Sequence, residues 1–220
     1  MIRLLSTLFL GAGLLQCATT ADKLIKRVET RYNAAQTLSV DFVENYNMQG
    51  HPRPPEEGKL TLRKGHMGAV DKMRWDYVHP AGKLFISDGK TVYLYSADEN
   101  RVERMPFKNT EDMRAPFAFL LGHLEMRKQF RDFSVRPGEG GEWLTGTSKN
   151  DRTPYDNIEM LIAGDGSVKQ LKVAGRDQSQ LTFTFSAEQV NVPVNDALFQ
   201  FNIPKGAEVV DSVTFDGQER

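Results

Sequence analysis

The chain has 220 residues, which is long enough for one domain with a sizeable core. Its 28 Lys and Arg and 29 Asp and Glu give a formal net charge of −1, which argues against a basic surface for nucleic acid or for an anionic membrane. Hydrophobic residues make up 40% of the chain and include 13 Phe, 6 Tyr and 2 Trp, so a large apolar interior is expected.

The first 21 residues have the order of a secretory signal peptide. Arg3 supplies a positive charge, the apolar run "LLSTLFLGAGLL" follows, and the small residues of "CATTA" come next. The run is too short to span a bilayer as an anchor. We therefore expect residues 1–21 to be cleaved off and residues 22–220 to form one domain; the alternative is a buried first helix.

Cys17 is the only cysteine and lies inside this leader, so the mature chain is expected to have no thiol. The alternative is that Cys17 survives as a lipidated N-terminus, because "LLQC" faintly resembles a lipobox. Gln16 argues against this alternative, because a small residue is expected before a lipidated Cys.

One helix is predicted at residues 22–36, where Leu24, Ile25, Val28 and Tyr32 share a face at helical spacing. After Thr37 the apolar residues alternate with a period of two, which predicts strands in "LSVDFVENYNM", "GKLTLRK", "MRWDYVH", "KLFISDG" and "TVYLYS". The alternation returns after residue 128 and continues to about residue 190.

The fragment Gly89-Lys90-Thr91 resembles part of a phosphate-binding loop, but its surroundings indicate a turn. Such a loop needs a glycine five residues before the Gly-Lys pair, where the chain has Leu84, and a helix after it, where "VYLYS" predicts a strand. Short Asp-Gly connectors at Asp88 and Asp165 are instead typical of type I′ hairpin turns.

The segment "APFAFLLG" interrupts the strands and is strongly apolar, with a helix break at Pro116. The remaining pattern predicts a mainly β (α+β) fold: about eleven antiparallel strands joined by short hairpins, forming one curved sheet or barrel.

Motifs for catalysis or metal binding are missing from the sequence. The four histidines, His51, His66, His79 and His123, are scattered without metal-ligand spacing, and no G-x-S-x-G motif is present. We therefore expect neither an enzyme nor a bound metal or cofactor.

Three segments resemble the LolA family of periplasmic lipoprotein carriers: residues 72–104, with Trp75, Pro80 and "SDGKT"; "APFAFLLG"; and the ending "VNDALFQFNIPKGAEVVD". The resemblance covers essentially the whole chain after the leader. It implies an incomplete antiparallel barrel with a helical lid, located in the periplasm of a Gram-negative-type envelope. It also implies a monomer that ferries acylated lipoproteins from an inner-membrane ABC transporter to an outer-membrane acceptor, without a cofactor.

The resemblance assigns site residues as follows. Phe117, Phe119, Leu120 and Leu121 would form the lid, and Lys64 stands where the family has a lid-contacting Arg. Lys cannot reproduce the planar fork of Arg, so lid control is expected to differ. The residues expected to line an acyl-chain cavity share strand faces: Phe42, Leu60, Leu62, Met73, Trp75, Leu84, Ile86, Leu94, Leu171, Val173, Leu181, Phe183 and Phe185. Which face points inward is open at this point, because a slip of one residue reverses every assignment.

Two other functions remain open. The chain could be an outer-membrane-anchored acceptor of the LolB type, lipidated at Cys17, or a lipoprotein-sensing module of the same fold. A filled barrel with a plain hydrophobic core is the structural alternative to a cavity.

Overall fold

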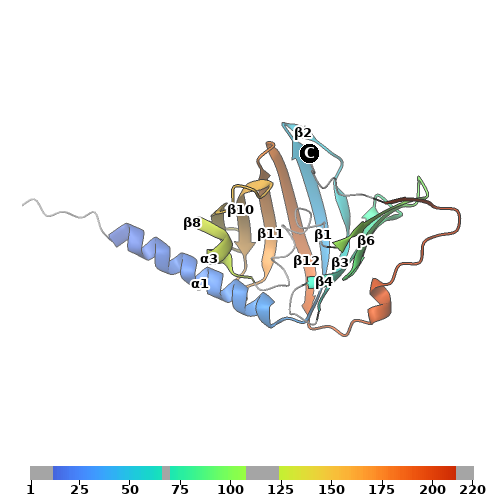
Figure 1. Ribbon diagram of the computed structural model, residues 1–220. Helices are drawn as coiled ribbons and strands as arrows, with labels where there is room; N and C mark the ends of the chain where they lie inside the picture. The colour runs from blue at the N-terminus through green and yellow to red at the C-terminus, as the bar shows by residue number, and fades with distance from the viewer. Residues whose placement is uncertain (1–11, 66–69, 108–123, 212–220) are drawn as a thin grey trace, which may run out of the picture.

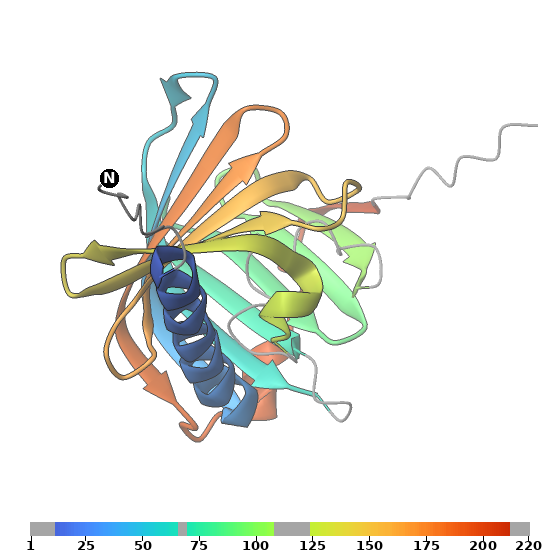
Figure 2. The ribbon, with the colours of Figure 1, turned by 90° about the vertical axis from the view of Figure 1, so that its left-hand side faces the viewer.

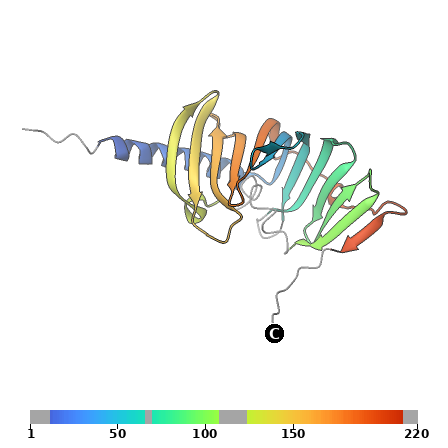
Figure 3. The same ribbon diagram turned by 90° about the horizontal axis from the view of Figure 1, so that it is seen from above.

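A single sheet forms the body of the molecule (Figures 1 and 3). The computed structural model describes residues 12–65, 70–107 and 124–211. Within them, the sheet has thirteen strands: twelve follow the order β13-β7-β6-β5-β4-β3-β1-β12-β11-β10-β9-β8, and the thirteenth, β2, pairs with β1 outside this order. The sheet curls but its two end strands do not pair with each other, so the barrel is open, which confirms the predicted fold class.

The strands have the following bounds: β1 Thr37–Met48, β2 His51–Pro52, β3 Glu56–Lys64, β4 Val70–His79, β5 Lys83–Asp88, β6 Thr91–Ser96, β7 Arg101–Pro106, β8 Phe130–Gly138, β9 Gly141–Ser148, β10 Tyr155–Ile162, β11 Val168–Gly175, β12 Ser179–Val190 and β13 Glu208–Asp211. All neighbouring pairs are antiparallel except β13 and β7, which are parallel. The helices are α1 Ala12–Ala34, α3 Met126–Gln129 and the 3-10 helix η2 Asp196–Phe199.

Helix α1 lies across one face of the curled sheet (Figure 2). Its apolar stripe is almost fully buried, as the helical spacing predicts, with exposures of 0–3% at Leu24, Ile25, Val28 and Tyr32. These side chains join one hydrophobic core with residues of β1, β3, β4 and β8 to β12. We call the sheet face that carries this core the inner face.

A largely buried polar network fixes α1 to strands β11 and β12. The Tyr32 hydroxyl donates to Glu188 Oε2 at 2.7 Å and accepts from the Val168 backbone N–H at 2.8 Å. Arg31 donates through Nε and Nη2 to Glu188 Oε1, at 2.9 and 2.7 Å. The network joins the helix to β12 and to the start of β11, and burial together with Glu188 raises the pKa of Tyr32, so the phenol stays protonated.

The C-terminal arm, residues 192–211, covers the opposite sheet face, which we call the outer face. Phe199 of η2 is buried, and the Phe201 ring lies 5.3 Å from Tyr93 and 5.8 Å from Tyr95. The arm ends in β13, which extends the sheet beyond β7 and which the strand pattern did not predict.

The Gly-Lys-Thr fragment is a hairpin turn between β5 and β6, as predicted. The Asp88 carboxylate accepts from the N–H groups of Lys90 and Thr91 at 2.7 and 2.8 Å, and Gly89 has a φ of 94°. Neither Asp88 nor Lys90 has a positive φ. The predicted type I′ turn is therefore wrong, because it requires two positive φ angles, whereas here the glycine alone adopts one.

We expect Tyr32→Phe to lower the free energy of unfolding by about 1–3 kcal/mol, because the variant leaves the buried Val168 N–H and Glu188 without their shared partner. Urea unfolding followed by circular dichroism measures the change. Tyr46→Phe is the matched control, since the Tyr46 hydroxyl makes only a 4.0 Å contact with the Met48 sulfur. Equal effects of the two variants would contradict this role of Tyr32.

Candidate functional site

The inner face brings together most of the residues predicted to line a cavity. The strand registers pair Leu60 with Trp75, Leu62 with Met73 and Phe183 with Leu171, so these side chains share one face. Ten of the thirteen lie in this core or pack directly against it: Phe42, Leu60, Leu62, Met73, Trp75, Leu171, Val173, Leu181, Phe183 and Phe185. Leu94 lies on the same face, where it pairs across the strands with Phe85.

Leu84 and Ile86 lie on the outer face, so the prediction that they share a face with Trp75 is wrong. Trp75 pairs with Phe85, whereas Arg74 and Asp76 pair with Ile86 and Leu84. Successive side chains of a strand point to opposite faces, and in "KLFIS" three consecutive apolar residues hide which ones point inward. Phe85, which the sequence reasoning missed, takes the inner position and packs against the core.

An aromatic group lies at the centre of the inner face. The Phe42 ring lies 4.9 Å from Trp75, 5.3 Å from Tyr77 and 6.4 Å from Phe183, each in an edge-to-face arrangement. Trp75 is 4% exposed and Phe42 2% exposed, so these rings are packed against the protein itself. A ligand that reaches them must displace part of this packing.

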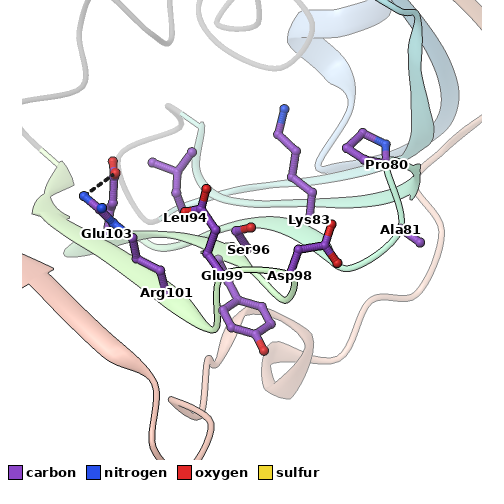
Figure 4. A pocket seen from close by; sticks show the side chains of 10 residues that line it. Pro80, Ala81, Lys83, Leu94, Ser96, Asp98, Glu99, Arg101 and Glu103 are labelled. Atoms are coloured by element: carbon purple, nitrogen blue, oxygen red, sulfur yellow. Dashed lines mark ion pairs between the residues drawn. The ribbon is translucent and has the colours of Figure 1, made fainter.

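Open space lies beside this group, in a recess of about 300 Å³ that includes the ends of β5, β6 and β7 (Figure 4). Figure 4 shows Leu94 and Lys83 on one side of these strands, with an Arg101–Glu103 ion pair of 3.2 Å nearby. The recess is lined by Pro80, Ala81, Lys83, Leu94, Tyr95, Ser96, Asp98, Glu99, Arg101 and Glu103. Its lining contains more polar side chains than the aromatic group does, so the inner face becomes more polar toward the ends of β5, β6 and β7.

Four polar side chains lie between the aromatic group and the recess. Glu44 and Glu56 are paired across β1 and β3, and Lys83 forms an ion pair with Glu56 while its ammonium lies 4.3 Å from the centre of the Tyr77 ring. Burial raises the pKa of Glu44 to about 7, and the neighbouring Glu56 carboxylate adds to this shift while Lys83 opposes it. Burial and the two carboxylates also raise the pKa of Tyr77, so its hydroxyl stays protonated.

Lys64 holds the C-terminal end of α1. Its ammonium donates to the backbone carbonyls of Asn33 at 2.6 Å and Tyr32 at 3.3 Å, where the helix end presents unpaired acceptors. The predicted lid residues Phe117, Phe119, Leu120 and Leu121 lie outside the described residues, so a contact between Lys64 and the lid stays a prediction.

Helix α1 also binds the segment that follows the lid sequence, a contact that no sequence pattern predicted. The Asn33 side chain accepts from the Leu124 N–H at 2.8 Å and donates to the Leu124 carbonyl at 3.0 Å. The Glu29 carboxylate accepts from the Met126 N–H at 2.9 Å. The described segment that begins at Leu124, after the lid sequence, is therefore tied to the same helix that Lys64 contacts.

Across the parts of the chain that the structure describes, no cluster of three or more His, Cys, Asp or Glu side chains is placed to hold a metal ion. Over the same residues, no helix has the length and apolar character needed to cross a membrane. The chemistry of the inner face is that of an apolar surface bordered by hydrogen-bonding groups.

We expect Glu44→Gln to raise the melting temperature at pH 8 and to leave it nearly unchanged at pH 4. The raised pKa of Glu44 means that the folded protein holds a proton that the unfolded chain releases, so the contribution of Glu44 to stability falls as pH rises between about 4.5 and 7. Gln stays neutral and avoids this loss. Thermal unfolding of both proteins at the two pH values checks the expectation, and a pH-independent difference would contradict it.

Comparison with known proteins identifies the family. The family described as outer membrane lipoprotein carrier protein LolA matches residues 33–202. The outer-membrane lipoprotein carrier protein of Chromobacterium violaceum is 25% identical over 207 residues, covering 94% of this chain and 96% of that protein. That of Cupriavidus taiwanensis is 34% identical over 143 residues, covering 63% and 65%.

A solved structure has the same fold. The lipoprotein LppX of Mycobacterium tuberculosis matches with a TM-score of 0.50 at 13% identity, covering 80% of this chain and 98% of that one. The family match over residues 33–202 includes most of the strands and the aromatic group of the inner face. The chain belongs to the LolA family of outer membrane lipoprotein carrier proteins.

Proposed function

We propose that this protein carries acylated lipoproteins through the periplasm and shields their acyl chains against the inner face of its sheet. It would receive them from an inner-membrane ABC transporter and deliver them to an outer-membrane acceptor. The observation that carries the proposal is the continuous aromatic and aliphatic surface on one face of an open, curled sheet, in a chain of the LolA family.

The size of the hydrophobic effect explains why such a surface is needed. Exposing a sixteen-carbon chain to water costs about 12 kcal/mol, at about 0.8 kcal/mol per methylene. A carrier exchanges the membrane interior for another apolar environment, and a nearly balanced exchange allows both loading and release. The packed rings of Phe42 and Trp75 support this balance, because a ligand gains contact with them only by displacing contacts they already make.

The N-terminal region fits the same proposal. We propose that residues 1–21 direct export and are removed, so that the carrier begins near Asp22. Ala21 and Leu24, on either side of this point, are each 1% exposed and belong to the hydrophobic core. Removal of residues 1–21 would therefore keep Leu24, Val28 and Tyr32 of α1 in the core.

The two tryptophans provide a direct test, because they lie on opposite faces of the sheet. Trp75 belongs to the inner core, whereas Trp143 pairs with Arg136 and lies beneath Arg136 and Lys172. We expect a diacyl lipopeptide with brominated chains to quench the fluorescence of Trp143→Phe, which keeps Trp75. The same ligand should leave Trp75→Phe, which keeps Trp143, almost unquenched.

Quenching of Trp143 alone would place the ligand on the outer face and contradict the proposal. Equal quenching of both variants would indicate nonspecific association. The unbrominated lipopeptide controls for changes in fluorescence that do not arise from contact with bromine.

A second test compares two half-buried leucines on adjacent strands. We expect Leu94→Asn to weaken binding of the diacyl lipopeptide about tenfold, because it removes apolar contact from the inner face. Leu84→Asn makes the same chemical change on the outer face and should bind normally. Titration calorimetry measures both affinities, and an equal loss in the two variants would show that the effect comes from stability instead of from the binding surface.

A further inference from the structure

Two half-buried polar groups on the inner face have no hydrogen-bond partner in the described parts of the chain. These are the carboxyl group of Glu44 and the hydroxyl group of Tyr77. Burial and nearby charges shift the pKa of each group, and neither group makes a hydrogen bond to another described residue. Both groups still reach solvent, since among the described residues Arg101 Nε alone is a fully buried side-chain polar atom without a partner. A ligand that covers this face would bury both groups and would therefore have to supply their hydrogen bonds. Their neighbours suggest that a ligand supplies the missing partners.

Both groups border the surface on which the acyl chains are proposed to lie. Glu44 pairs across the strands with Phe183, and the Tyr77 ring stacks 6.4 Å from Trp75. Lys83 continues the row on β5 and lines the recess. The inner face therefore passes from aromatic rings, through these three side chains, to a more polar recess.

The row offers hydrogen-bond donors. The Tyr77 hydroxyl stays protonated, the Lys83 ammonium is held in place by Glu56, and a neutral Glu44 carboxyl carries a proton that it can donate. Glu56 is already paired with Lys83, so the row has little free carboxylate to attract an ammonium ligand. Its chemistry fits a group that is rich in acceptors and attached to an apolar chain.

We propose that Glu44, Tyr77 and Lys83 form a subsite for the ester carbonyl oxygens of an acylated glyceryl head group, whose chains lie against Phe42, Trp75 and Phe183. The inference rests on the proposed carrier function and adds to it. The aromatic group binds any apolar chain, whereas the three donors select chains that end in a carbonyl. The subsite also sets how far the head group can enter, with the recess beyond it.

The test uses the full chain as secreted and two synthetic lipopeptides. One is a dipalmitoyl glyceryl cysteine peptide, and the other is its dihexadecyl ether twin, which has the same peptide and chain length but no ester carbonyls. We expect the wild type to bind the ester more tightly than the ether. Tyr77→Phe and Glu44→Leu should each reduce this preference about 3- to 10-fold, which is the range for one lost hydrogen bond, and leave ether affinity unchanged or higher.

Two further variants control for structural effects. Glu44→Gln keeps an N–H donor at the same place and should retain most of the preference for the ester. Tyr93→Phe removes a hydroxyl from the outer face, where Tyr93 packs against Phe201, and should leave the preference unchanged. Circular dichroism verifies that each variant is folded.

The outcomes separate the subsite from the carrier function. Equal binding of ester and ether by the wild type would overturn the subsite and leave the carrier function standing. The subsite would also be overturned if Tyr77→Phe and Glu44→Leu weakened both ligands equally, since that result reports lost packing. Failure of the wild type to bind either lipopeptide would overturn the carrier function and the subsite together.

Discussion

The structure depends on the strict alternation of side chains along one continuous sheet. A single sheet has two faces, and here both are rich in apolar residues, so each needs a cover. Helix α1 covers the inner face beside β8 to β12, and the C-terminal arm covers the outer face of β4 to β7. Neither cover is a second sheet, and each packs on only part of its face.

Much of this architecture could be predicted from the sequence, since alternation and hairpin signals are local. The apolar stripe of α1, the turn at Gly89 and the grouping of Trp75 with Leu60 and Met73 all follow from spacing. The outward positions of Leu84 and Ile86 could not be predicted from spacing, because "KLFIS" is apolar on both faces. Their register is set by the pairing of β5 with β4. The strand β13 was also missed, because its four residues are recognisable as a strand only through their pairing with β7.

The polar part of the site was beyond sequence reasoning for a different reason. Glu44, Glu56, Tyr77 and Lys83 are ordinary residues of surface strands when read one at a time. They become a group only when β1, β3, β4 and β5 curl together, which partly buries Glu44 and raises the pKa of its carboxyl group. Lys64 likewise lies in a typical strand. Its role at the end of α1 depends on a hydrogen bond to the Asn33 carbonyl, which lies 31 residues earlier in the chain.

An open barrel leaves two strand edges exposed, and such edges invite pairing with another copy of the chain. In this protein each edge is shortened or bent. At one end the four-residue β13, with its Arg104–Asp211 ion pair of 2.7 Å, replaces the longer β7 as the last strand. At the other end β8 has a bulge between Arg131 and Ser134, where Asp132 has a φ of 53°, and Pro137 removes an amide donor near its end. The sheet can thus stay open for its cargo without offering a long, flat template on which fibres or stacked dimers could grow.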